Sequence, residues 1–182
     1  MKSNDDDIKI FHPEKKGGAG ADLAELALLM DNYRSNGNME KASALGEALA
    51  ELSPETLCPK DAEKLNTNEL RQLRALMVFS AQISLHKYLP HQMLSSQAVN
   101  AMYKQISNNH PGLFANISDG SSFTFYYLSV RKNKNVEESI GQNYAMLCDR
   151  DEDEYYMSLG SRVFTQTDIK VCDMIEDFKF KK

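Results

Sequence analysis

The feature that most constrains the fold is one long segment, residues 66–89, which reads NTNELRQLRALMVFSAQISLHKYL. Asn66 is a good N-cap, because its side-chain oxygen accepts a hydrogen bond from a free N–H group of the first turn. Glu69 lies three residues later, where a capping box has its carboxylate. Pro90 disfavours helical geometry at Leu89. These signals predict one helix about 35 Å long.

This helix is predicted to lie in the centre of the molecule. Residues 75–79 read ALMVF, so the helix has no polar face for more than one turn. A helix that is apolar on most sides is buried among other elements. The segment is too short and too polar at its flanks to cross a membrane. We therefore expect no membrane association.

Apolar residues recur at helical spacing along most of the remaining chain. The pattern predicts further helices over residues 22–34, 39–52, 95–108, 121–132, 136–147 and 153–178. A chain of 182 residues is expected to form one domain. The prediction is an all-α, single-domain helical bundle of six to seven helices, with an N-terminal αα-hairpin, a central buried helix and a long C-terminal helix. This domain is expected to span residues 22–182, after a flexible N-terminal tail over residues 1–21.

The segment 121–132, which reads SSFTFYYLSVRK, is the most ambiguous part of the chain. Its alternation and its aromatic content permit a strand. No second strand is predicted to pair with it, and a lone strand leaves its backbone groups without partners. The alternative is a helix capped by Ser121. It has four residues on one side: Phe123, Tyr126, Tyr127 and Val130. We therefore predict a helix.

The first two predicted helices are joined by a short turn, residues 35–38, which reads SNGN. Gly37 is free to take a positive φ, and Asn38 is expected to cap the second helix. Two helices with so short a connection are expected to pack antiparallel.

The predicted hairpin resembles one tetratricopeptide unit. Five residues match that family's pattern: Leu29, Tyr33, Gly37, Ala42 and Pro54. Three positions depart from it: Met30, Gly46 and Leu49. The match covers under a fifth of the chain, and the residues that follow do not repeat it, whereas a solenoid needs about three units. The resemblance therefore implies a shared local shape.

The last predicted helix has an apolar stripe at near-heptad spacing: Tyr156, Gly160, Val163, Thr167, Val171, Met174 and Phe178. Helices with such stripes pair with other helices, so a homodimer through the C-terminal helix is one expectation. In the preceding helix, Gly141 is expected to allow a close helix crossing, because glycine inside a helix costs about 1 kcal/mol.

No residue pattern points to catalysis or to a metal. Three aspartates alternate like the first ligands of a calcium loop: Asp149, Asp151 and Asp153. The glycine and the closing glutamate of such a loop are missing. The histidines fit none of the zinc or di-iron patterns. The sequence predicts no catalytic residue, no metal and no cofactor, and it leans against an enzyme.

The cysteines and the net charge indicate a cytoplasmic protein that does not bind nucleic acid. Three cysteines at unrelated spacings are expected to be reduced thiols: Cys58, Cys148 and Cys172. Cys58 lies near a predicted helix start, where the dipole can lower the pKa of a thiol, but no pattern supplies a partner base. The net charge of −5 is unlike the basic stripe of a nucleic-acid-binding surface.

Aromatic residues become more frequent after Tyr103. Tyrosine is favoured at pocket mouths and interfaces, because its ring is apolar and its hydroxyl polar. Tyr126 or Tyr127, with Arg131 one turn later, are candidates for a groove that accepts an anionic or planar group. Tyr144 is a further candidate. The alternative is that these tyrosines are ordinary core residues with hydroxyls in water.

Two functions are favoured by these patterns; a third, an enzyme with no recognisable motif, would need carboxylates or histidines clustered in a cleft with mutually perturbed pKa values. The first is a non-catalytic protein–protein interaction or adaptor module, which binds a protein partner through a helical groove or an exposed apolar face. The second is a small-ligand-binding regulatory protein with a tyrosine-rich pocket between helices.

Overall fold

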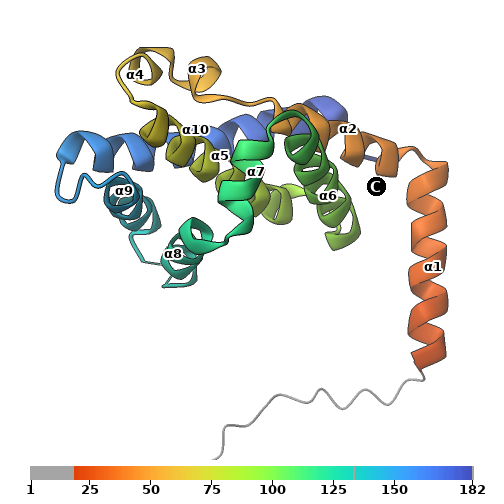
Figure 1. The fold of residues 1–182 in the computed structure, drawn as a ribbon. Coiled ribbons are helices and arrows are strands. Elements are labelled where there is room, and N and C mark those ends of the chain that lie inside the picture. Colours follow the sequence, from red (N-terminus) through yellow and green to blue (C-terminus); the bar gives the residue numbers. More distant parts are fainter. Residues whose placement is uncertain (1–18, 133, 182) are drawn as a thin grey trace, which may run out of the picture.

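The structure is a computed structural model that describes residues 19–132 and 134–181 (Figure 1). Within these ranges the chain forms ten α-helices and no strand. They are α1 (Ala19–Ser35), α2 (Asn38–Ala50), α3 (Pro54–Leu57), α4 (Pro59–Ala62), α5 (Thr67–Tyr88), α6 (Gln92–Asn109), α7 (Pro111–Ser118), α8 (Ser121–Lys132), α9 (Val136–Leu147) and α10 (Glu154–Phe178).

The predicted all-α fold is confirmed, and 121–132 is a helix. The helices outnumber the six to seven predicted, because α3, α4 and α7 are short and the sequence indicated them only as turns. Of the tail predicted over residues 1–21, residues 1–18 lie outside the described residues, and α1 begins at Ala19.

The central helix, α5, has the capping predicted for it. The Asn66 side chain accepts hydrogen bonds from the N–H groups of Asn68 and Glu69 at 2.9 and 3.0 Å. The Glu69 carboxylate accepts one from the Asn66 N–H at 2.9 Å, which completes the capping box. Residues 75–81 are all buried, so α5 is enclosed on every side for nearly two turns.

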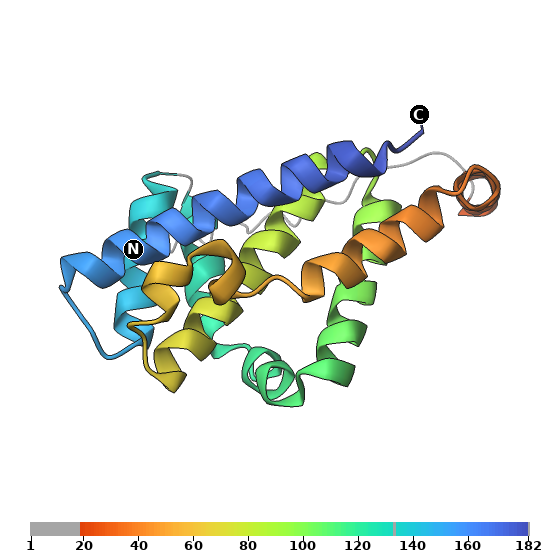
Figure 2. The ribbon, with the colours of Figure 1, turned by 90° about the horizontal axis from the view of Figure 1, so that it is seen from above.

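The other long helices pack around α5 in two groups. α10 lies along one side of the molecule and packs on both α5 and α9 (Figure 2). α2 packs on α6, the most extensive contact in the described chain beside that of α10 with α9. The near-heptad stripe of α10 packs into this interior: Gly160, Val163, Thr167 and Val171 are buried, together with Leu159 beside the stripe.

Two of these helix crossings depend on a glycine. A Cβ atom on Gly46 in α2 would overlap the backbone carbonyl of Ala98 in α6. A Cβ atom on Gly141 in α9 would overlap the backbone carbonyl of Met157 in α10. The close crossing predicted from Gly141 is therefore confirmed, and Gly46 provides a second one.

α1 projects away from the other helices (Figure 1). The short turn is present, with Gly37 at φ 79°, but the predicted antiparallel packing of the first two helices is wrong. The physical reason is that the buried face of α2 packs on α6 and not on α1. Large apolar side chains of α1 consequently remain exposed: Leu23, Leu26 and Leu28.

Asn38 does not cap α2, contrary to the prediction, because the N-cap is Gly37. The Asn38 side chain is fully buried and pairs with the backbone of Lys181 instead. Its Nδ2 donates to the Lys181 carbonyl at 2.7 Å, and its Oδ1 accepts from the Lys181 N–H at 3.0 Å. Asn38 thus fastens the C-terminal segment to the start of α2.

Candidate functional site

α8 presents different side chains to the core and to solvent. The buried residues are Ser122, Phe123, Tyr126 and Ser129. The large apolar residues that remain exposed are Phe125, Tyr127 and Leu128, at 40, 43 and 49%. The Ser129 hydroxyl lies 2.8 Å from the Ser139 hydroxyl and accepts from Asn143 Nδ2 at 2.7 Å. These bonds to α9 fix the rotation of α8 about its axis.

A groove lies between α5 and α8, and we call it the α8 groove. It is lined by Ile83, Thr124, Tyr127, Leu128, Val130 and Arg131, with a volume of about 470 Å³. Arg131 is the charged residue in this lining, and most of the remaining surface is apolar. The structure thus brings two of the sequence candidates, Tyr127 and Arg131, together at one surface groove.

Tyr127 is held in the wall of the groove by contacts with α5. Its hydroxyl accepts a hydrogen bond from Gln82 Nε2 at 2.8 Å, while Gln82 Oε1 accepts one from the Tyr103 hydroxyl at 2.7 Å. Its ring meets that of Phe79 edge-on, with 5.1 Å between centroids. Burial raises the pKa of Tyr127, so its hydroxyl stays protonated at neutral pH.

The other two candidates, Tyr126 and Tyr144, lie in the core and do not line the groove. Tyr126 is fully buried against the ring of Phe79, with 5.3 Å between centroids, and its hydroxyl has no hydrogen-bond partner. Tyr144 is also fully buried, and its hydroxyl donates to the Glu69 carbonyl at 3.3 Å. Burial raises the pKa of both hydroxyls, which keeps them neutral.

Sequence reasoning missed four residues of the groove: Ile83, Thr124, Leu128 and Val130. A signal for Leu128 was present in the helical pattern. At about 100° per residue, Leu128 lies about 150° from the centre of the stripe predicted over 123–130. A leucine on the side of the helix opposite the buried stripe cannot pack in the predicted core. Its position therefore indicated an exposed apolar residue.

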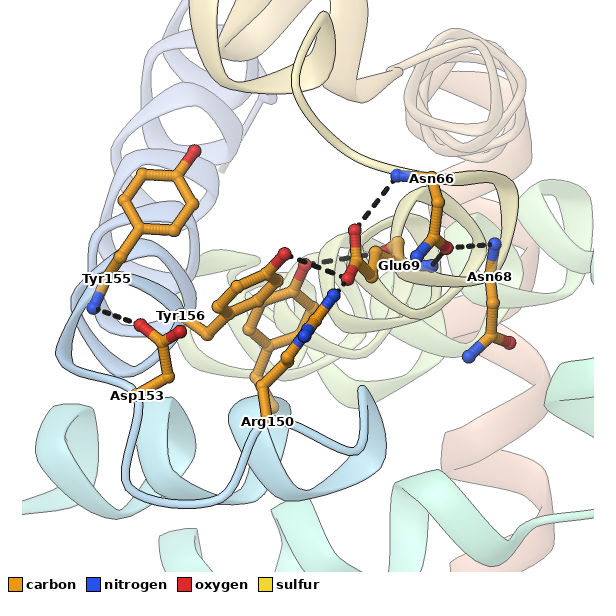
Figure 3. Close-up of polar contacts among 8 residues, drawn as sticks. Asn66, Asn68, Glu69, Arg150, Asp153, Tyr155 and Tyr156 are labelled. Atoms are coloured by element: carbon orange, nitrogen blue, oxygen red, sulfur yellow. Dashed lines mark hydrogen bonds and ion pairs between the residues drawn. The ribbon is translucent and has the colours of Figure 1, made fainter.

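A second concentration of polar contacts surrounds Glu69 (Figure 3). Glu69 is 2% exposed, and its Oε1 accepts from the Tyr156 hydroxyl at 2.8 Å and from Arg150 Nε at 3.2 Å. Burial opposes its ionisation, but the Asn66 N–H, Tyr156 and Arg150 outweigh that effect and hold the pKa of Glu69 below its usual value. The cluster ties the start of α5 to α10 and its preceding loop, so we interpret it as structural.

His86 and His91 form local hydrogen bonds, and none of the cysteines is in a disulfide. His86 Nδ1 lies 2.9 Å from the Ser95 hydroxyl, and His91 Nδ1 accepts from the Met93 N–H at 3.1 Å as the N-cap of α6. All three cysteines are free. Burial raises the pKa of the Cys58 thiol, and raises that of Cys148 to about 11. Over residues 19–132 and 134–181, no group of three or more His, Cys, Asp or Glu side chains is arranged to hold a metal ion.

No helix in the described part of the chain combines the length and the apolar character needed to span a bilayer. Comparisons of the chain with models of protein families, with curated proteins and with solved structures find no match.

Proposed function

We propose that this chain is a non-catalytic protein-interaction module whose α8 groove binds an apolar segment of a partner protein. The observation that carries the proposal is the exposure of Phe125, Tyr127 and Leu128 beside an apolar groove of about 470 Å³. Single exposed apolar side chains are common on proteins, but adjacent ones at a concave surface are typical of interaction sites.

The occupant we propose is an amphipathic helix with an acidic end. Its apolar face would lie against Ile83, Leu128 and Val130, in the manner of other helix-in-groove complexes. Arg131 lies in the lining and forms no ion pair with another described residue. Lys132 follows Arg131, so this end of the groove is positively charged although the net charge of the chain is −5. A carboxylate on the bound helix would be complementary to these two cations.

A displayed library of short helical peptides, selected on the full chain, tests the proposal. Selected peptides are expected to repeat apolar residues at spacings of three and four, next to acidic residues. Their affinity for Leu128→Glu should be at least about tenfold lower than for the wild type, because the new carboxylate would be buried without a partner.

The matched control is Ile169→Glu. Ile169 is a 56% exposed apolar residue of α10 that does not line the groove, so this variant should bind the peptides as the wild type does. Thermal unfolding of both variants verifies that they are folded. Peptides that bind Leu128→Glu as tightly as Ile169→Glu would show that the α8 groove is not the interaction site.

A small planar anion is a second candidate occupant of the same groove. It is favoured by the presence of Tyr127 and Arg131 in one lining and by a volume within the usual range of ligand pockets. Tyr126 and Tyr144 would not take part, because both are fully buried. Saturable binding that Arg131→Gln abolishes, together with a failed peptide selection, would support this alternative.

We also propose a cytoplasmic location, which the three free cysteines favour.

A homodimer through the C-terminal helix remains a prediction. Since the near-heptad stripe of α10 packs within the chain, such a dimer would use the opposite side of the helix, where Ile169 is exposed. Sedimentation equilibrium measures the oligomeric state directly: the wild type is expected to dimerise and Ile169→Glu to stay monomeric.

A further inference from the structure

A separate cavity lies where α3, α5 and α7 meet, and we call it the arginine pocket. It is lined by Pro54, Glu55, Leu70, Arg71, Arg74 and Leu113, with a volume of about 180 Å³. None of these residues lines the α8 groove. The lining combines two cations, one carboxylate and three apolar side chains, which is a mixture typical of ligand sites.

Arg74 is a partly buried cation without an ion-pair partner. Its Nε is buried and has no hydrogen-bond partner, and its Nη1 lies 3.4 Å from His110 Nδ1. No described carboxylate forms an ion pair with Arg74, whereas Arg150 and Arg162 each face one. A charge removed from water is costly unless it is paired. The described chain therefore leaves a charge at this cavity for an external anion to balance.

Two carboxylates close enough to feel the charge of Arg74, those of Glu55 and Glu51, form their hydrogen bonds with other groups. The pKa of Glu55 is lowered first by its own backbone N–H and by the Ser53 side chain, with Arg74 as a minor influence. The carboxylate of Glu51 accepts hydrogen bonds from the side-chain amides of Gln105 and Asn109 at 3.2 and 3.1 Å. Neither carboxylate forms an ion pair with Arg74, although the charge of Arg74 contributes to lowering the pKa of both.

Arg71 brings a second positive charge to the cavity, one turn before Arg74. Like charges three residues apart on a helix are neighbours and destabilise it. Arg71 Nη2 donates to Asn68 Oδ1 at 2.6 Å, which uses only one of its donors. An anion between the two guanidinium groups would relieve their repulsion and accept their remaining N–H groups.

The volume and the apolar lining of the cavity indicate what kind of ligand bears the anionic group. Pro54, Leu70 and Leu113 supply apolar surface. An engineered apolar cavity of about 150 Å³ holds one benzene molecule, so the arginine pocket has room for a single ring or a short branched chain. Guanidinium groups bind carboxylates through paired hydrogen bonds. We propose that the arginine pocket binds a small monocarboxylate with an aromatic or branched aliphatic body, held by Arg74 with Arg71 beside it.

Benzoate is the probe, and benzyl alcohol is its uncharged counterpart. Both are titrated into the full chain while the leucine methyl resonances are followed by NMR. Benzoate is expected to shift the methyl resonances of Leu70 and Leu113 to saturation, and benzyl alcohol to bind at least about tenfold more weakly. Arg74→Met should abolish saturable binding of benzoate. Arg71→Gln should weaken benzoate binding several-fold. Because Arg71 is exposed, this variant keeps the test valid if Arg74→Met does not fold.

The control is Arg34→Gln, which removes an exposed arginine from α1 and should leave benzoate binding unchanged. Equal affinities for benzoate and benzyl alcohol would overturn the proposal, because the cavity would then not recognise charge. Tighter binding of inorganic phosphate than of benzoate would overturn it too, since the apolar walls would then contribute nothing. A titration with no saturable shift at Leu70 and Leu113 would contradict it outright.

Discussion

At the scale of single residues, Glu69 shows how a buried charge is kept in the fold. Burial works against its carboxylate, and three donors from Asn66, Tyr156 and Arg150 hold its pKa below the usual value. A carboxyl group with a lowered pKa stabilises the folded state fully above its unfolded pKa, which is about 4.3. That contribution to stability is lost as the pH falls through the pKa that Glu69 has in the folded state.

We predict that Glu69→Gln lowers the free energy of unfolding by about 2 kcal/mol at neutral pH, because it removes charge-assisted hydrogen bonds. The difference from the wild type should be constant above about pH 5 and shrink below about pH 4.3. Urea denaturation of both proteins over this pH range measures it. Glu47→Gln, at an exposed position of α2, is the control and should change stability by less than about 0.5 kcal/mol. A Glu69→Gln effect that does not depend on pH would contradict the ionised state assigned here.

Asn38 leads to a second prediction at this scale. Asn38→Ala removes both hydrogen bonds to Lys181 and leaves a cavity at a fully buried position. We expect a loss of about 1–2 kcal/mol in stability and faster hydrogen exchange at the Lys181 amide. Exchange followed by NMR tests this result. An unchanged exchange rate at Lys181 would mean that Asn38 does not hold the C-terminal segment.

At the scale of elements, two helix pairs approach through glycine. α2 meets α6 at Gly46, and α9 meets α10 at Gly141. Glycine inside a helix costs about 1 kcal/mol relative to alanine. Its presence at both positions is explained by backbone contact, since a side chain there would overlap a carbonyl of the facing helix.

We predict that Gly46→Ala and Gly141→Ala each lower the free energy of unfolding by about 1–3 kcal/mol, because the facing backbones must separate. The loss should exceed the gain in helix propensity. Gly112→Ala in α7 is the control: nothing lies within 4 Å of a Cβ at that position, so it should be neutral or stabilising by up to about 1 kcal/mol. The midpoints of urea denaturation rank the three variants, and a stabilised Gly46→Ala or Gly141→Ala would contradict the close crossings.

At the scale of the whole molecule, the sequence predicts where helices lie better than which faces meet. The capping box of Asn66 and Glu69 is local, so it was readable from a few residues. The start of α6 was placed too late, at residue 95, because its N-cap is His91, which is not a common capping residue.

Contacts between distant elements were beyond the reach of such local signals. α2 packs on α6 and makes little contact with α1, and nothing in the periodicity of α1 indicates which helix α2 will pack on. The candidate site divides for a similar reason. Tyr126 and Tyr127 are adjacent in sequence and both contact the ring of Phe79, but Tyr126 is fully buried, whereas Tyr127 is 43% exposed and lines the groove. Helix geometry separates the two side chains by about 100°. The hydrogen bonds from Ser129 to α9 fix the orientation of α8 about its axis, and this orientation decides which of the two faces the groove.

Native-state hydrogen exchange over the whole chain tests most directly the claim that α5 is the core around which the other helices pack. We predict that the amides of residues 75–81 exchange slowest, with a free energy equal to that of global unfolding, and that the amides of α1 exchange with little protection. Amides of α1 protected as strongly as those of α5, or amides of residues 75–81 that exchange through local opening, would contradict this account.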